Sequence, residues 1–209
     1  SKWAANYVVE KINQKAAITD KPFVLGCPTG SSPLGMYKEL IRLNKEGKVS
    51  FKNVVTFNMD EYVNLPKEHP ESYYSFMWNN FFSFIDIKPE NVHILNGNAP
   101  DLIAECNAYE EAIASYGGID LFLGGIGPDG HIAFNVKGSD FHSTTRLTYT
   151  NFKTQAAAAS DLGGIEISRH KPVITIGLDT ITYNQDATAI IFAAGEAKAR
   201  VVADALEGH

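Results

Sequence analysis

The sequence predicts an α/β protein with one domain, built on a mostly parallel sheet with helices on both faces. Short apolar runs of strand length alternate along the chain with longer segments of helical apolar spacing. This alternation implies right-handed crossovers between parallel strands. The length of 209 residues is enough for one sizeable core and short for two. No repeat or linker divides the sequence, so we expect a single domain over residues 1–209.

The first half of the chain alternates the two patterns from its beginning. Apolar residues from Trp3 predict a helix to about residue 14, and the apolar run 22–27 predicts a strand. A helical period then resumes at Leu34, Tyr37, Leu40 and Ile41. A second apolar run follows at 54–57, and an aromatic segment at 70–82 has Pro70 suited to a first helical turn. This half is therefore expected to run helix, strand, helix, strand, helix.

The second half continues the alternation. In order, we expect a short strand at 91–95, an Ala- and Glu-rich helix at 101–116, an apolar strand at 119–123 that runs into glycines, a helix at 153–161, apolar strands at 173–176 and 189–193, and a final helix at 196–206. Ligands of parallel sheets bind beyond the carboxyl ends of the strands, so the loops there are the first place to search for function.

Composition restricts the classes of partner. The net charge of −6 argues against nucleic acid or an anionic membrane as the main partner, because both require clustered Lys and Arg. A small anionic substrate stays compatible, since backbone N–H groups and a few cations can bind phosphate on an acidic protein. No signal peptide or membrane span is apparent, so we expect a cytoplasmic protein. Cys27 and Cys106 match no metal or redox motif and are expected to be core thiols in a reducing compartment.

The loop 28–33 follows the first expected strand and precedes a helix. Its small residues Thr29, Gly30, Ser31 and Ser32 offer hydroxyls and exposed backbone N–H groups, which suit a phosphate. The alternative is an ordinary turn in which Ser32 is the N-cap and Pro33 the first helical residue. The loop lacks the Gly-Lys-Ser/Thr ending of a Walker motif.

Two carboxylates, Asp60 and Glu61, follow the strand expected at 54–57. Adjacent carboxylates at a strand end can titrate apart, which would let one act as a general base near neutral pH. The alternative is a solvated turn or a helix cap. The aromatic segment 69–78 that follows is expected to pack beneath this loop.

A glycine-rich loop at 124–135 carries Asp129 and His131. The glycines permit positive φ and close approach of a ligand, and the carboxylate can fix the imidazole tautomer and raise its basicity. No second His or Cys stands at ligand spacing, so we predict no metal site. Of the other histidines, His93 is expected to pack in a strand, whereas His69, His142 and His170 are assigned surface or capping roles.

Together these loops resemble the glucosamine-6-phosphate deaminase/isomerase family from about Trp3 to the end of the chain. The matching stretches are 54–82, with Asp60-Glu61-Tyr62-Val63 and His69-Pro70-Glu71-Ser72-Tyr73, then 124–135, 96–98 and 28–33. The related 6-phosphogluconolactonases share the Asp-Gly-His motif but lack both motifs of the first stretch. The resemblance therefore favours a deaminase, with a Rossmann-like fold of the deaminase/isomerase type.

The resemblance implies conversion of glucosamine 6-phosphate and water to fructose 6-phosphate and ammonium, with no cofactor. By motif, Asp60 corresponds to the base that moves the C2 proton to C1. His131 corresponds to the group that opens the pyranose ring, and Asp129 to the residue that orients it. The implied partner is an amino-sugar phosphate, and family members often form hexamers, so a homo-oligomer is expected.

The resemblance also assigns the substrate phosphate to the loop of Thr29, Gly30, Ser31 and Ser32, and to Lys198. An Arg that the family supplies to the phosphate falls near Ser160 here, with Arg169 as a possible replacement. Arg146 and Ser139 match positions of an allosteric site, whereas the Lys expected nearby aligns with Thr148. By the same comparison, the chain lacks the first strand of the family and roughly the last fifth of its length.

One departure lies beside the expected catalytic histidine. The family has a Glu after the Asn of the Asp-Gly-His loop, but here Val136 follows Asn135. This change leaves other functions open: a catalytically impaired sugar-phosphate sensor or regulatory subunit, or an isomerase of another sugar phosphate in which Asp129 alone assists His131. A 6-phosphogluconolactonase-like hydrolase is a further alternative.

Overall fold

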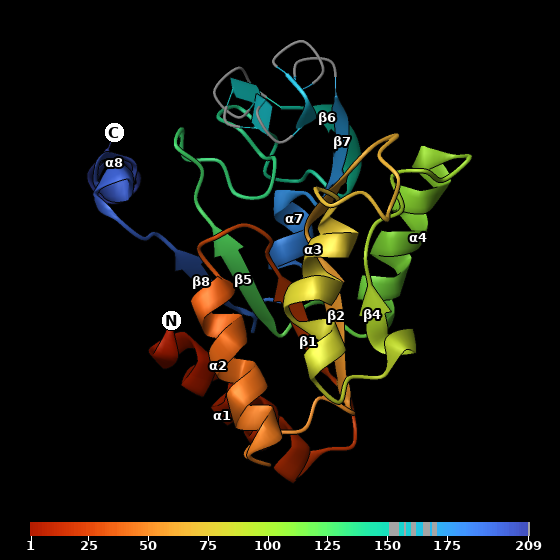
Figure 1. The fold of residues 1–209 in the computed structure, drawn as a ribbon, viewed down its shortest axis with the longest axis vertical. Coiled ribbons are helices and arrows are strands. Elements are labelled where there is room, and N and C mark those ends of the chain that lie inside the picture. Colours follow the sequence, from red (N-terminus) through yellow and green to blue (C-terminus); the bar gives the residue numbers. More distant parts are fainter. Residues whose placement is uncertain (151–154, 157, 160–161, 165–167, 169–170, 209) are drawn as a thin grey trace.

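A computed structural model describes residues 1–150, 155–156, 158–159, 162–164, 168 and 171–208 (Figure 1). Its centre is a sheet of five parallel strands in the order β4-β2-β1-β5-β8. The strands are β1 (Phe23–Cys27), β2 (Val54–Asn58), β4 (Val92–His93), β5 (Leu121–Gly125) and β8 (Thr188–Phe192). The predicted single-domain α/β fold with a mostly parallel sheet is confirmed.

Helices cover both faces of this sheet (Figure 1). The helices are α1 (Lys2–Ile18), α2 (Leu34–Lys45), α3 (Tyr73–Asn80), α4 (Leu102–Ser115), α7 (Leu178–Thr182) and α8 (Ala199–Glu207), with 3-10 turns at Phe82–Phe84, Pro89–Asn91 and Glu196–Lys198. Leu25 and Leu123 point into one core with α1, α2 and α3. Val24 and Phe122, one position away along each strand, point into the second core with α4 and α7. The period-two alternation of a strand thus supplies both cores.

The strand expected at 173–176 is the main correction to the predicted topology. The structure places it as β7 (Pro172–Thr175) in a separate antiparallel sheet of order β3-β7-β6, with β3 (Asp60–Tyr62) and β6 (Arg146–Tyr149). From the sequence, Asp60 was expected in a loop, and β6 was not predicted. Both become strands because they pair with β7, which is distant in sequence, and local apolar spacing carries no signal for such pairing.

Most other expected elements are confirmed with shifted ends. The helix expected at 70–82 begins at Tyr73, because Pro70 lies in the preceding turn and the Ser72 hydroxyl caps the helix by accepting from Ser75 N. The helix expected at 101–116 is α4, and its N-cap Asp101 accepts from Ile103 N and Ala104 N. Part of the helix expected at 153–161 lies outside the described residues. The short helix α7 was not predicted.

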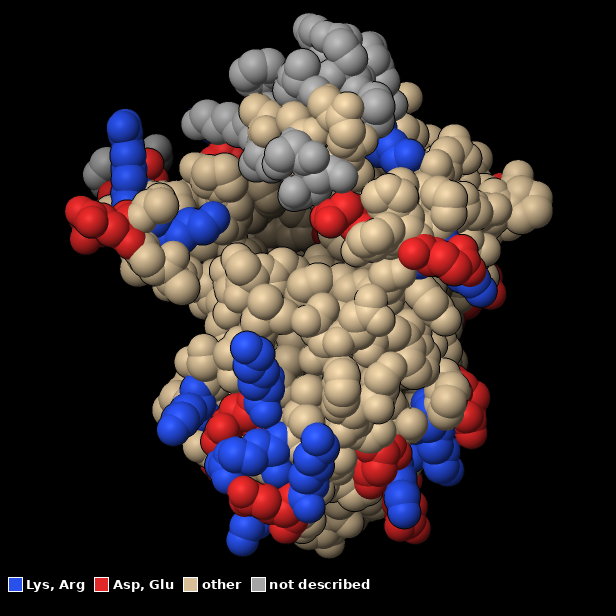
Figure 2. Space-filling model, in the orientation of Figure 1, with Lys and Arg blue, Asp and Glu red and all other residues tan. Residues whose placement is uncertain are grey.

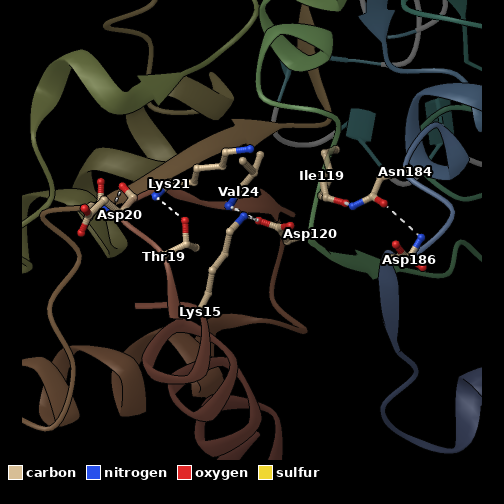
Figure 3. A network of polar contacts seen from close by, with 10 residues as sticks. Lys15, Thr19, Asp20, Lys21, Val24, Ile119, Asp120, Asn184 and Asp186 are labelled. Atoms are coloured by element: carbon tan, nitrogen blue, oxygen red, sulfur yellow. Dashed lines mark hydrogen bonds and ion pairs between the residues drawn. The ribbon is translucent and has the colours of Figure 1, made fainter. Parts of the chain in front are cut away.

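Asp120 fastens the end of the sheet opposite the carboxyl ends of the strands (Figure 3). Its carboxylate accepts from Lys15 Nζ at 2.6 Å and from Val24 N at 2.8 Å. Its own N–H donates to Val24 O, and its carbonyl accepts from Thr188 N. The Asp120 side chain therefore joins α1 and β1 to the start of β5, and the Asp120 backbone carbonyl joins β5 to the start of β8.

None of the helices that the structure describes has the length and apolarity needed to cross a membrane. Cys27 and Cys106 are free and buried, as expected of core thiols. Burial raises the pKa of the Cys27 thiol to about 12 and raises that of Cys106 as well, so neither is a reactive thiolate near neutral pH.

We predict that Asp120→Ala lowers the free energy of unfolding by roughly 1 to 3 kcal/mol, because it leaves Val24 N and Lys15 Nζ without their acceptor. Urea denaturation followed by circular dichroism measures the change. The control is Asp186→Ala, whose exposed carboxylate makes no contact with the part of the chain described. Equal stability of the two variants would remove Asp120 from this role.

Candidate active site

Four loops meet at the carboxyl edge of the central sheet. They follow β2, β1, β5 and β8, which are neighbours in that order. Their strand ends are in register, since Cys27 pairs with Asn58 and Gly125 with Phe192. Figure 2 shows this face of the molecule hollowed between the body that holds α1 to α3 and the part that carries β6 and β7. A basic side chain lies on one side of the hollow and an acidic one on the other.

Asp60 stands directly beyond the end of β2 and is almost fully buried, with 6% of its surface exposed. It pairs with Thr175 across the antiparallel ladder, and Ile176 N donates to Met59 O beside it. No described residue donates a hydrogen bond to its carboxylate. Burial, with a smaller contribution from the charge of Glu61, raises the pKa of Asp60 to about 8. A carboxyl with this pKa can accept a proton near neutral pH.

Glu61 is equally buried but differently bound. Its carboxylate accepts from Tyr62 N at 2.9 Å, from Tyr73 N at 3.0 Å and from Tyr74 N at 2.9 Å. The last two are the first N–H groups of α3, so Glu61 caps this helix from another segment. Of the alternatives, the solvated turn is therefore wrong and the helix cap is correct, for Glu61 alone. The aromatic segment packs against this strand as expected, with Tyr62 and Tyr73 rings 5.0 Å apart.

Asp129 and His131 are in direct contact in the loop after β5. Asp129 Oδ1 lies 2.5 Å from His131 Nδ1, and both side chains are mostly buried. The contact fixes the orientation of the imidazole ring and leaves Nε2 as the nitrogen that can exchange a proton with a ligand. Gly127 is required here, because a Cβ on it would lie 2.1 Å from His131 Cε1. Gly130 has φ of 88°, which a side chain rarely permits.

The small antiparallel sheet connects this loop to Asp60. Phe134 N donates to the hydroxyl of Thr175, the residue that pairs with Asp60. The Asn135 amide donates to Ile176 O at 2.9 Å. The two candidate catalytic segments are thus bonded to the same strand end, although they are far apart in sequence.

A tight turn separates His131 from Val136. Ile132 and Asn135 exchange backbone hydrogen bonds across this turn, so the chain reverses between the two residues. Ala133 within the turn has φ of 53°, an uncommon conformation for a residue with a side chain. Val136 directly follows the turn, at the position where the resemblance expects a Glu.

The loop 28–33 lies between the Asp60 segment and the His131 loop, because β1 lies between β2 and β5. Helix α2 begins at Leu34 with Pro33 as N-cap, and no side chain caps it, so the interpretation of Ser32 as N-cap is wrong. The hydroxyls of Thr29, Ser31 and Ser32 bond to no other described residue. Gly30 has φ of 94° with open space around its Cα.

Lys198 reaches the same edge from the last loop. Its Nζ donates to Ile126 O at 2.6 Å and so joins the segment after β8 to the glycine-rich loop. An ammonium has three donors, which leaves two for an anion. Ser160 and Arg169, the positions considered for a phosphate-binding Arg, lie outside the described residues.

The other candidate residues have local roles. His93 stacks on Phe57 with ring centroids 4.5 Å apart, as expected of a packing residue, and burial lowers its pKa. His69 Nδ1 accepts from Glu71 N in the turn before α3. Arg146 begins β6 and contacts Thr144 O. His170 is outside the described residues. Among the residues described, no group of His, Cys, Asp and Glu could hold a metal.

Sequence reasoning missed two contributors to the site. Thr175 carries both the pairing with Asp60 and the bond to Phe134 N, yet nothing local distinguishes it from a buried strand Thr. A helix cap was one alternative for the two carboxylates, but the sequence did not indicate that Glu61 is the one that caps a helix, or that the helix is α3. The distance of Glu61 from Tyr73 in sequence exceeds that of any local capping motif.

Comparisons with known proteins agree with the arrangement of these loops. A family model described as glucosamine-6-phosphate isomerases/6-phosphogluconolactonase matches residues 1–209. The glucosamine-6-phosphate deaminase of Bacteroides thetaiotaomicron is 61% identical over 208 residues, covering 100% of this chain and 76% of that protein. The glucosamine-6-phosphate deaminase of Borreliella burgdorferi is 54% identical over 207 residues, covering 99% and 76%.

Solved structures give the same result. A monomeric glucosamine-6-phosphate deaminase superimposes with a TM-score of 0.91 at 39% identity, covering 100% of this chain and 83% of that one. The 6-phosphogluconolactonase of Thermotoga maritima superimposes with a TM-score of 0.69 at 24% identity, covering 98% and 86%. At that identity the second similarity concerns the fold alone.

We predict that Asp60→Asn stabilises the protein in a pH-dependent way. A carboxyl whose pKa is raised to about 8 on folding contributes stability that is present at low pH and lost as the pH rises through 8. The amide introduced by Asp60→Asn does not ionise, so the variant does not lose this stability as the pH rises. The variant should therefore match wild type near pH 4 and exceed it at pH 9 by roughly 2 to 5 kcal/mol.

Chemical denaturation at the two pH values measures this difference. Asp20→Asn, an exposed carboxylate replaced in the same way, is the control and should follow the wild-type curve. A constant offset between Asp60→Asn and wild type at all pH values would mean that Asp60 does not titrate as described.

Proposed function

Because the chain belongs to the glucosamine-6-phosphate isomerase/6-phosphogluconolactonase family, we propose that it is a glucosamine-6-phosphate deaminase. It converts glucosamine 6-phosphate and water to fructose 6-phosphate and ammonium, without a redox cofactor. The observation that carries the proposal is the buried Asp60, whose pKa is raised to about 8, bonded through one strand end to the loop of the Asp129–His131 pair. Such a base suits proton abstraction beside a carbonyl.

In the proposed reaction His131 opens the sugar ring. Its Nε2 carries a proton between the C1 hydroxyl and the ring oxygen as the bond from C1 to that oxygen breaks. Asp129 holds Nδ1 at 2.5 Å and stabilises the imidazolium that forms during the transfer. The open chain then has an aldehyde at C1, which acidifies the proton on C2.

Asp60 takes this C2 proton. The electron pair of the C2–H bond forms the C1–C2 double bond while the π pair of the C1 carbonyl moves onto O1, which takes a proton from the protonated amine on C2. Asp60 then returns its proton to C1 as the nitrogen lone pair forms an iminium at C2, and this iminium adds water and releases ammonium. A carboxylate without hydrogen-bond donors from the described residues is a stronger base than a solvated one. The burial of Asp60 therefore makes it a better base for the C2 proton.

The phosphate is assigned to the loop of Thr29, Gly30, Ser31 and Ser32 and to Lys198. Support comes from the hydroxyls of this loop, which bond to no other described residue, from the positive φ of Gly30, and from the position of the loop before α2, where the helix dipole favours an anion. Lys198 adds the positive charge at the neighbouring strand end.

A lactonase function has less support. The relatives that are 54 to 61% identical are named deaminases, whereas the matching lactonase structures share 15 to 24% of their residues with this chain. Lactone hydrolysis also needs no base at a C2 proton, so it would leave the burial of Asp60 without a purpose.

Three further expectations remain part of this proposal. We expect a cytoplasmic protein and no nucleic-acid partner. We also expect a homo-oligomer, although one solved relative is described as monomeric. The elution volume of the purified protein with light scattering tests the oligomeric state.

The direct test is the release of ammonium and fructose 6-phosphate from glucosamine 6-phosphate by the purified protein. We expect both products in equal amounts. Asp60→Asn should lower kcat by about 10²-fold or more while ligand binding persists, because an amide keeps the shape but cannot accept the proton. Wild-type turnover by this variant would exclude Asp60 as the base, and no product from wild type would overturn the proposed function.

We predict that Lys198→Ala weakens binding of the sugar phosphate by roughly 1.5 to 3 kcal/mol, the contribution of a charge-assisted hydrogen bond. Unphosphorylated glucosamine should bind poorly to wild type and variant alike. Calorimetry with both sugars measures the effect, and Lys21→Ala at the opposite end of the sheet is the control. Equal affinity of wild type for the two sugars would contradict the phosphate assignment.

We predict that Val136→Glu raises the rate of ring opening. A carboxylate that reaches His131 favours the imidazolium and makes the ring a more available acid near neutral pH. The gain should appear with the cyclic substrate and not with an open-chain analogue, which bypasses ring opening. If both proteins bind the sugar phosphate and neither turns over the cyclic form, the chain is a sensor rather than an enzyme.

A further inference from the structure

Glu61 lies next to Asp60, yet its surroundings give it a different role. Its side chain is 4% exposed and contacts three backbone N–H groups, two of them at the first turn of α3. The other first-turn donors are also satisfied, since Ser72 N bonds to His69 O and Ser75 N to the Ser72 hydroxyl. Glu61 is therefore the acceptor that completes the start of this helix.

These contacts bind β3 to α3. Glu61 is the middle residue of β3, and the N–H groups of Tyr73 and Tyr74 lie across from it on the helix. The neighbouring Asp60 has no such donors among the described residues. Its position is therefore set by the strand, and the strand is held by Glu61 on one side and by β7 on the other.

The charge of Glu61 also acts on Asp60. Backbone donors stabilise the ionised form of Glu61 against the burial that raises its pKa, whereas burial and the Glu61 charge together raise the pKa of Asp60 to about 8. The phenols of Tyr62, Tyr73 and Tyr109 also face Asp60 and stay neutral, because burial raises their pKa. Glu61 is the one charged group in the described part of the chain that shifts the Asp60 equilibrium.

We propose that Glu61 is a positioning residue for the proposed base: its carboxylate anchors β3 to the start of α3, and its negative charge, one residue away, adds to the effect of burial on Asp60. The inference rests on the proposed function for the identity of the reaction. The two carboxylates have different roles: amides stabilise the charge of Glu61, whereas burial, with a smaller contribution from Glu61, keeps Asp60 basic. Asp60 cannot replace Glu61 as the anchor, because of these two carboxylates Glu61 is the one that accepts from the N–H groups of α3.

Two variants separate charge from anchoring. Glu61→Gln removes the charge and presents an amide to one of the α3 donors. Glu61→Asp keeps the charge but is one methylene shorter, so it loses reach toward α3. Glu71→Gln, an exposed carboxylate in the turn before the same helix, is the matched control.

The primary readout is the titration of the Asp60 carboxyl carbon by NMR, assigned by its absence in Asp60→Asn. We expect its midpoint to fall by about one pH unit or more in Glu61→Gln and to stay unchanged in Glu61→Asp and Glu71→Gln. The acid limb of kcat/KM should move in the same way. Its plateau should fall in both Glu61 variants, because both lose contacts to α3.

A purely structural role would lower the plateau without moving the midpoint. An unchanged Asp60 midpoint in Glu61→Gln therefore overturns the inference while leaving the deaminase function intact. If wild type releases no ammonium, the function fails, and the NMR titration still decides the effect of Glu61. If Glu61→Gln does not fold, the wild-type spectrum decides: we expect Glu61 to ionise at lower pH than Asp60, and the reverse order contradicts the proposal.

Discussion

The structure depends on burying two adjacent carboxylates at the end of a parallel sheet. Ionised carboxylates are costly to bury, so each must be compensated or must give up its charge. Glu61 is compensated by amides that helix α3 leaves open, whereas Asp60 is uncompensated and stays protonated to a higher pH. The cost of burial therefore falls mainly on Asp60, the side chain proposed as the base, whereas hydrogen bonds stabilise its neighbour Glu61. Activity and stability therefore compete at Asp60.

The small antiparallel sheet gives the site its geometry. A doubly covered parallel sheet brings loop ends to one edge but does not fix the distances between them. Here β7 does so, since Thr175 pairs with Asp60 and accepts from Phe134 N, and the following carbonyl of Ile176 holds Asn135. The proposed base, Asp60, and the loop of the proposed ring-opening histidine, His131, are thus both bonded to one strand end. Lys198 supplies the comparable link on the other side of the glycine-rich loop.

Much of this arrangement follows from the sequence, because its signals are local. The apolar runs predicted the strands of the central sheet, and the glycines with Asp129 and His131 predicted a loop suited to a ligand or a substrate. Strand β3 could not be predicted in this way, because its three polar residues become a strand only by pairing with β7. The sequence predicted that Asp60 and Glu61 could titrate apart and offered a helix cap for them, but it could not show which of the two is capped. They differ only because the amides of Tyr73 and Tyr74 lie near one of them.

The central claim is that Asp60 carries a proton from C2 to C1 of an aminosugar phosphate. Its most direct test is the reaction in ordinary water of glucosamine 6-phosphate that carries deuterium at C2, followed by NMR. An enzyme that uses Asp60 in this way should give fructose 6-phosphate with part of that deuterium at C1, and Asp60→Asn should leave the deuterium on C2 of the substrate. Deuterated product formed equally by both proteins would contradict the account.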